Sequence, residues 1–178
     1  MFILFSMALA HAQMFSLQPL NRLSAGGSYA DSSFGLGMSF ESRLTQIIYV
    51  NIGAFRSLSE AEYEGDELRD KIKLRHGVWA APGIRLPHRY KKSKNAINWD
   101  LFLRTGFGCF FNDLADKPDA FNMEPGALVG ADLLLLWRDV GIRISGKSVF
   151  QNAYVSTEDQ SLLLISPLLN IDFYSQFK

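Results

Sequence analysis

The sequence lacks features that several large classes of protein require. Its 178 residues include one cysteine, Cys109, so no intrachain disulfide can form. Beyond the N-terminus, the longest apolar run covers residues 133–137 and is bounded by Asp132 and Arg138. A membrane helix needs ~18 consecutive apolar residues. These absences exclude a disulfide scaffold and a polytopic helical membrane protein, so a chain of this kind can enter a membrane only as a closed sheet.

The charge is also not of one sign. There are 18 basic and 18 acidic residues, which gives a formal net charge of +0. Proteins that bind nucleic acid through their overall field carry a basic excess. The sequence therefore argues against nucleic acid as a partner. It also contains no phosphate-binding loop, nucleophile elbow or histidine-rich metal pattern, so neither a cofactor nor a metal is predicted.

A strict period of two is the strongest feature that is present. Residues 33–40 place Phe34, Leu36, Met38 and Phe40 on one side of a strand and only serine and glycine on the other. The outward side of a soluble sandwich usually carries charged or long polar residues, whereas the smallest residues suit a crowded interior. The pattern predicts a closed barrel whose apolar side faces lipid and whose polar side faces a narrow lumen.

The same periodicity recurs in eight segments. We expect strands over residues 22–30, 33–41, 44–55, about 70–86, 98–110, 127–137, 140–147 and 169–177, the last being the end of the eighth strand. Pro82 and Gly83 predict a bulge in the fourth strand. Residues 112–126 and 151–160 are expected to form long loops. The sequence thus predicts an all-β fold, an antiparallel up-and-down transmembrane β-barrel of eight strands.

The first twelve residues predict export. An apolar run over residues 2–9 precedes Ala10-His11-Ala12, which has the small-x-small form of a signal-peptidase site. No lysine or arginine precedes that run. We therefore expect a signal peptide over residues 1–12 that lacks its basic start, followed by a single barrel domain over residues 13–178. A retained N-terminal strand or helix is the alternative.

The end of the chain carries a more specific signal. Ile171, Phe173 and Phe177 alternate in a terminal strand, which resembles the C-terminal signature that the assembly machinery of bacterial outer-membrane barrels reads. The chain differs from that signature at two positions. Lys178 follows the last phenylalanine, and Ser175 stands at a place usually held by an apolar or aromatic residue. The chain as a whole resembles the small eight-stranded outer-membrane barrels. That resemblance implies a place in the bacterial outer membrane, contact with lipid bilayer and lipopolysaccharide, and recognition by the assembly machinery, but no specific ligand.

Charged residues recur on the side that is expected to face the lumen. They are Lys73, Arg75, Asp100, Arg104, Asp132, Arg143, Lys147 and Asp172. Eight strands enclose only enough room for side chains, and a charge in a dry interior must be paired. We therefore expect a salt-bridged plug rather than a water-filled pore. A proton or ion path through Asp100, Arg104 and Asp132 is the alternative.

Two connections carry charge of one sign. The third-to-fourth connection holds Glu60, Glu62, Glu64, Asp66 and Glu67. If both termini are periplasmic, it is a surface loop that is either solvated or a divalent-cation binder. The next connection holds Arg85, His88, Arg89, Lys91, Lys92 and Lys94. By the same topology this connection would face the periplasm, where turns are usually short. Either it binds acidic partners or phosphates, or the predicted number of strands is wrong by one.

These observations predict a non-enzymatic outer-membrane barrel whose loops stabilise the envelope or bind something outside the cell. The first alternative is a lipid-modifying acyl hydrolase or transferase on the same fold, with His76 on the lipid side. Val78 stands where a His-x-Ser spacing would place the serine. The second alternative is a soluble exported barrel of lipocalin type, in which the apolar side of residues 33–40 would point inward; the glycine and serine side argues against it.

Overall fold

The computed structural model describes residues 20–31, 33–59, 72–86, 97–114, 117–155 and 160–177. The described residues form eight strands and no helix that is long and apolar enough to cross a membrane. The strands are β1 (Asn21–Ala30), β2 (Ser33–Arg43), β3 (Ile48–Ser57), β4 (Ile72–Arg85), β5 (Asn98–Leu114), β6 (Lys117–Trp137), β7 (Val140–Val155) and β8 (Gln160–Phe177).

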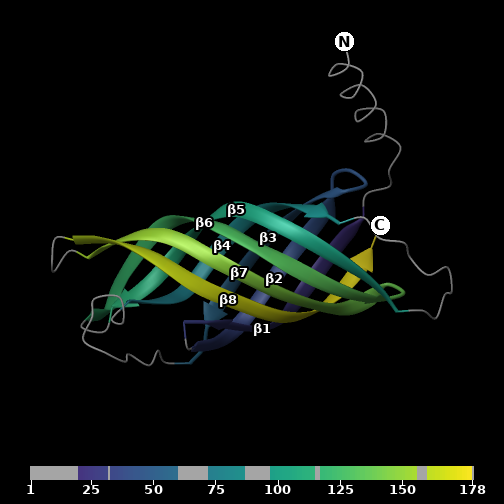
Figure 1. Ribbon diagram of the computed structural model, residues 1–178. Helices are drawn as coiled ribbons and strands as arrows, with labels where there is room; N and C mark the ends of the chain where they lie inside the picture. Colours follow the sequence, from purple (N-terminus) through teal and green to yellow (C-terminus); the bar gives the residue numbers. More distant parts are fainter. Residues whose placement is uncertain are drawn as a thin grey trace, which may run out of the picture.

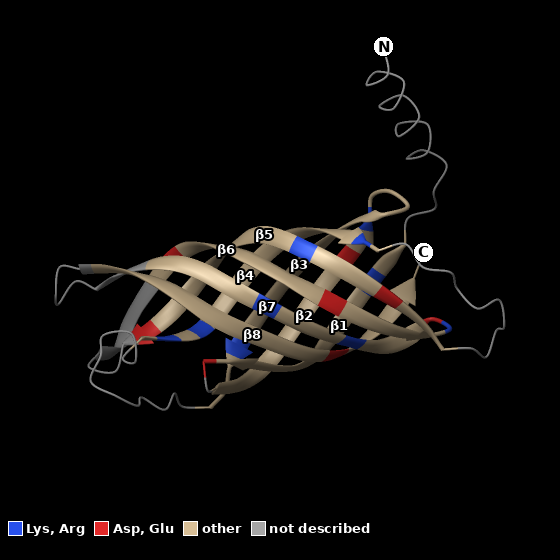
Figure 2. Ribbon diagram, in the orientation of Figure 1, with Lys and Arg blue, Asp and Glu red and all other residues tan. Residues whose placement is uncertain are grey.

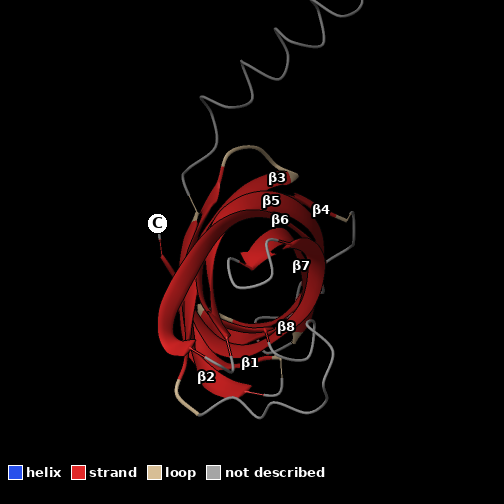
Figure 3. Ribbon diagram, turned by 90° about the vertical axis from the view of Figure 1, so that its left-hand side faces the viewer, coloured by secondary structure: helices blue, strands red, loops and turns tan. Residues whose placement is uncertain are grey.

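Every strand pairs antiparallel with its neighbour in the sequence, and β1 also pairs with β8. That last pairing runs from Asn21 opposite Phe177 to Ala30 opposite Leu168 and closes the barrel. The strands are strongly inclined to the long axis (Figure 1), and the view along the axis shows a closed ring (Figure 3). The predicted eight-stranded antiparallel barrel is confirmed.

Side chains alternate between the two faces of the wall, as the period of two requires. In β2, Phe34, Leu36 and Met38 expose 70%, 59% and 63% of their surface, whereas Ser33 and Ser39 are buried inside the barrel. Large apolar side chains face outward from all eight strands. The lipocalin alternative is therefore wrong, because it needs these side chains to line an internal cavity.

Glycines on the inner face make room for aromatic rings. A Cβ atom at Gly53 would overlap the Trp79 ring, and one at Gly77 would lie 2.6 Å from the Phe110 ring. The rings of β4 and β5 thus pack against bare backbone on the neighbouring strands. This close approach is the physical reason for the small residues in the alternating pattern.

Two apolar clusters lie inside the barrel. The Tyr49 cluster, near the termini, consists of Tyr49, Phe102, Leu134, Leu136 and Tyr174. The Phe110 cluster, farther from the termini, consists of Ala30, Phe55, Leu74, Trp79, Ala81, Phe110, Leu128, Val149 and Leu168. The inward positions between the two clusters include Asn51 on β3, Asp132 on β6, and Asn170 and Asp172 on β8.

The third strand begins later than the pattern suggested. Residues 44–47 form a turn in which the N–H groups of Leu44 and Thr45 donate to the carbonyl of Ile48, at 2.9 and 3.1 Å. The Thr45 hydroxyl in turn accepts from the Ile48 N–H at 2.9 Å. An apolar residue, Ile47, belongs to this turn, which explains the break in alternation there.

The segments expected as long loops are mostly strand. β5 and β6 remain paired as far as Leu114 opposite Lys117, and β7 and β8 as far as Val155 opposite Gln160. The first of these segments contains Pro118 and Pro125, and proline is typical of loops. Among the described residues, the pairing of β6 with β7 begins at Gly126, and a strand edge outside the ladder is where a proline is tolerated.

The bulge of β4 lies at a different place from the one expected. The register against β5 is the same at Ala80 and Gly83, so the Pro82–Gly83 prediction is wrong. The register shifts instead between Leu74 and His76. The Leu74 N–H donates to the carboxylate of Asp31, in the turn after β1, at 2.9 Å. A bulge re-aims the following side chains, so Leu74 and Gly77 both point inward.

Candidate functional site

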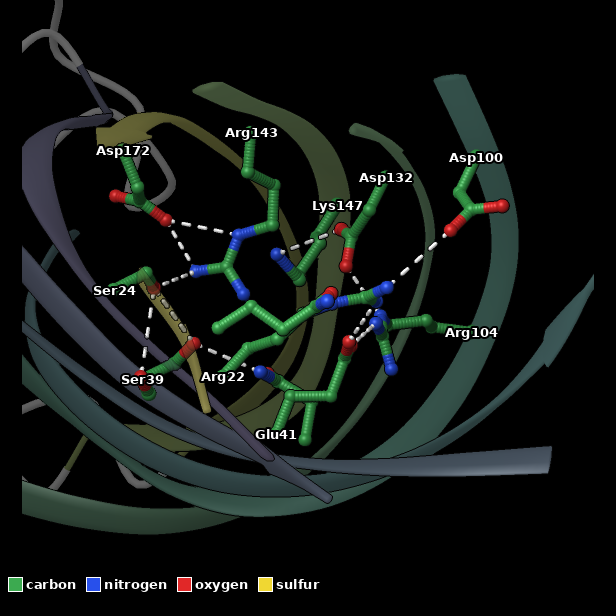
Figure 4. Close-up of polar contacts among 12 residues, drawn as sticks. Arg22, Ser24, Ser39, Glu41, Asp100, Arg104, Asp132, Arg143, Lys147 and Asp172 are labelled. Carbon is green, nitrogen blue, oxygen red and sulfur yellow. Dashed lines mark hydrogen bonds and ion pairs between the residues drawn. The ribbon is translucent and has the colours of Figure 1, made fainter. Parts of the chain in front are cut away.

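The inner face of the barrel holds a layer of paired charges between the two apolar clusters (Figure 4). Its members are Arg22, Glu41, Asp100, Arg104, Asp132, Arg143, Lys147 and Asp172. Four are cationic and four are acidic, and none exposes more than 5% of its surface. We call this set the charge layer.

Arg104 of β5 is at the centre of the charge layer. Its guanidinium donates from Nη2 to the Glu41 carboxylate and from Nε to the Asp132 carboxylate. Lys147 reaches the other oxygen of Asp132, with Nζ 3.3 Å from Oδ1. One guanidinium therefore links carboxylates from β2 and β6, and β7 supplies a second cation.

Arg22 extends the layer toward the termini. It contacts Oε1 of Glu41 at 2.7 Å through Nη1 and Oδ2 of Asp100 at 3.3 Å through Nη2. The other oxygen of Asp100 lies 3.9 Å from Nε of Arg85 at the end of β4. The guanidinium of Arg22 thus connects β1 with β2 and β5.

A separate branch runs from β7 to β3. Arg143 forms an ion pair with Asp172 and donates to the Ser24 hydroxyl at 2.7 Å. The hydroxyls of Ser24 and Ser39 are 3.1 Å apart, and the Asn51 amide donates to Ser39 at 2.8 Å. Side chains from all eight strands therefore take part in one polar layer.

Aromatic rings cover this layer on both sides. The Arg22 guanidinium lies 5.3 Å from the Tyr49 ring centre and 5.8 Å from that of Phe102, both in the Tyr49 cluster. On the opposite side, the Lys147 ammonium lies 5.6 Å from the Trp79 ring centre. Such contacts stabilise desolvated cations.

The structure brings together six of the eight charges predicted for the lumen. Lys73 and Arg75 are not among them. Lys73 lies between the buried residues Ile72 and Leu74 and so belongs to the outer face. The bulge turns Arg75 outward as well, where its Nε is 2.9 Å from Oδ2 of Asp113. These two assignments were wrong because a one-residue shift moves side chains to the other face.

Sequence reasoning missed Arg22 and Glu41. Both continue an alternation that had already been recognised, since Arg22 shares a face with Ser24 and Glu41 shares one with Ser39. Extending the period of two to the strand ends would have found them.

His76 lies on the outer face of β4, where its cross-strand partners are Arg56 on β3 and Phe111 on β5. Its charged neighbours include Arg56, Arg75 and Asp113. Neither cross-strand partner is a serine or another nucleophile. A serine hydrolase needs a hydroxyl hydrogen-bonded to the imidazole, and neither neighbouring strand places a serine directly opposite His76.

Several predicted residues lie outside the described part of the chain. These are residues 1–12, the acidic residues Glu60, Glu62, Glu64, Asp66 and Glu67, and the basic residues His88, Arg89, Lys91, Lys92 and Lys94. Within the described ranges, no group of three or more histidine, cysteine or acidic residues is placed to hold a metal ion.

The terminal residues Ile171, Phe173 and Phe177 lie on the outer face of β8, and all three are exposed. Ser175 shares that face. A shallow hollow of about 700 Å³ runs past it between β6, β7, β8 and β1, lined by Leu135, Ile142 and Phe173 among others.

Solved structures resemble this barrel. The N-terminal β-barrel domain of Pseudomonas aeruginosa OprF has a TM-score of 0.60 and 10% identity, over 90% of this chain and 100% of that one. Neisserial surface protein A has a TM-score of 0.55 and 12% identity, over 89% of this chain and 97% of that one. The fold is that of the small outer-membrane β-barrels. No protein-family model and no curated protein matches the sequence.

Proposed function

We propose that this chain is a non-enzymatic protein of the bacterial outer membrane, which spans the bilayer with its eight strands and has both termini in the periplasm. The observation that carries the proposal is the contrast between the two faces of the wall. Charged residues lie along the middle of the strands (Figure 2), yet at mid-barrel their side chains point inward, while leucine, isoleucine, valine and phenylalanine point outward. A soluble barrel would reverse that contrast.

Aromatic side chains support the same orientation. Trp99 and Trp137 are exposed near the end that holds the termini. Tyr29 and Phe34 lie at the opposite end with ring centres 5.1 Å apart. Membrane barrels place aromatic girdles at both interfaces, and exposed apolar side chains such as Met38 and Ile171 lie between these two pairs.

The barrel would act as a closed anchor rather than as a channel. The charge layer and the two apolar clusters fill the lumen, so the protein's activity would reside in the connections that it presents on the two sides of the membrane. We assign the acidic residues 60–67 to the external side, the basic residues 85–94 to the periplasmic side, and recognition by the assembly machinery to the terminal residues Ile171, Phe173 and Phe177.

The membrane assignment is tested by electrophoresis of membrane-extracted protein with and without boiling, together with fractionation of the envelope. Closed membrane barrels resist detergent until they are heated. We expect a band that changes mobility on boiling and protein in the outer-membrane fraction. A single band from freely soluble protein would overturn the proposal.

The closed lumen is tested separately, by conductance in a planar bilayer. The wild-type protein should give no stable ion current, because the charges are paired and covered by rings. Steady single-channel current from a protein that still shifts on boiling would favour the ion path through Asp100, Arg104 and Asp132 over the plug.

A further inference from the structure

Four basic side chains gather on the outer face of the wall, at the end of the barrel away from the termini. They are Arg56, Lys73, Arg75 and His76. The outward positions elsewhere in the middle of the strands are apolar or small. A charge that faces lipid near the bilayer midplane costs about 2–4 kcal/mol, and near an interface about 0–1 kcal/mol. We call these four residues the cationic cluster.

Strand register places the cluster in one patch. Arg56 on β3 stands opposite Leu36 on β2 and opposite His76 on β4, and His76 stands opposite Phe111 on β5. Directly opposed side chains have Cβ atoms roughly 4.5–5.5 Å apart. The row therefore reads leucine, arginine, histidine and phenylalanine across four strands.

The β4 bulge is what assembles the cluster. Without the register shift between Leu74 and His76, Arg75 and His76 would point to opposite faces. With it, both join Lys73 on the outer face. Two acidic residues are near: Asp113, which stands opposite Lys73 and pairs with Arg75, and Asp31, whose carboxylate accepts from the Leu74 N–H. The three cations Arg56, Lys73 and Arg75 outnumber these two carboxylates, so the patch keeps a net positive charge.

An apolar groove of about 510 Å³ leads away from this patch toward the middle of the barrel. Its walls include Ala25, Leu36, Met38 and Ala54, with Arg56 at the end near the cluster. Leu36 and Met38 are among the most exposed apolar side chains of β2. The surface thus offers an acyl chain a groove and an anionic group a cationic end.

We propose that this surface binds one molecule of lipid A, with an acyl chain in the groove and a phosphate at Arg56 and Lys73. The inference rests on the proposed function, since it requires this end of the barrel to lie in the outer leaflet. There the phosphate-bearing lipid is lipopolysaccharide. Arginine and lysine side chains form charge-assisted hydrogen bonds with phosphate, and His76 adds a further donor or acceptor.

The test uses native mass spectrometry of the refolded protein in a zwitterionic detergent, titrated with bisphosphorylated lipid A, phosphatidylglycerol or phosphatidylcholine. We expect tightest binding for lipid A. Arg56→Gln and Lys73→Gln should each weaken lipid A binding by about fivefold, and together by more, because each removes one charged contact with phosphate.

Arg138→Gln is the matched control. Arg138 is also an exposed arginine, with its guanidinium over the Trp137 ring in the turn between β6 and β7, at the end that holds the termini. Its removal changes the net charge of the protein by the same amount and should leave lipid A binding unchanged.

Three results would overturn the inference. They are equal weakening by Arg138→Gln, equal binding of phosphatidylglycerol, and unchanged binding in Arg56→Gln. Each variant is first tested for the mobility shift on boiling. If the protein changes mobility on boiling but Arg56→Gln binds lipid A as tightly as the wild type, only the lipid site is refuted. If the wild-type protein does not change mobility on boiling, the membrane assignment is refuted.

Discussion

Two adjacent layers of the barrel interior are equally buried and have opposite chemistry. The charge layer around Arg104 is held by directional ion pairs between defined atoms. The Phe110 cluster is held by ring and aliphatic contacts against bare glycine backbone at Gly77 and its neighbours. Shortening an apolar side chain lowers the free energy of unfolding in proportion to the volume that is removed. Removing one member of a buried ion pair, in contrast, leaves an uncompensated charge. The two layers should therefore respond differently to equally small changes.

The largest effect is expected from Arg104→Met. The substitution keeps much of the side-chain volume and leaves the carboxylates of Glu41 and Asp132 without their central cation. The free energy of unfolding should fall by about 3–5 kcal/mol. Urea unfolding in lipid vesicles, followed by the combined fluorescence of Trp79, Trp99 and Trp137, measures this loss. Arg138→Met, at an exposed turn, is the control and should change stability by less than about 0.5 kcal/mol.

A second change should recover part of that loss. In Arg104→Met with Asp132→Asn, one of the two carboxylates that lost Arg104 becomes neutral, and Glu41 keeps its contact with Arg22. Lys147 loses its partner in the double variant, so recovery is incomplete. We expect the double variant to be about 1–2 kcal/mol more stable than Arg104→Met alone. Additive losses in the same urea titration would contradict a coupled charge layer.

The smallest effect is expected in the apolar layer. Phe110→Leu removes part of a ring from the space between β4 and β6 and leaves no polar group unpaired. The loss should be about 1 kcal/mol. If this variant unfolds as readily as Arg104→Met, the interior depends on close packing throughout, and the contrast between the two layers is wrong.

The candidate site was predictable where alternation is regular. Asp100, Arg104 and Asp132 follow directly from counting by twos along β5 and β6. Arg22 and Glu41 follow from the same count, carried to the ends of β1 and β2. Lys73 and Arg75 do not, because the register shift of β4 breaks the count, and the contact between Leu74 and Asp31 joins residues 43 positions apart in the chain.

The strand boundaries, too, were predictable only where the alternation is uninterrupted. The sequence pattern located β1 and β2 to within two residues at each end, since both alternate without interruption. It ended β5 at Phe110 and began β6 at Ala127, because Pro118 and Pro125 are typical of loops. The hairpin continues regardless, since each strand supplies the other with backbone partners as far as Leu114 and Lys117.

The sequence by itself determined the fold class, the number of strands and the chemistry of each face, because all three depend on a local period of two that every strand carries in its own residues. Tertiary structure decided which charges pair, where the register shifts and which basic side chains meet on the outer wall. Those features arise between strands. Arg104 meets Glu41, 63 residues away, only once β1 and β8 have closed the ring.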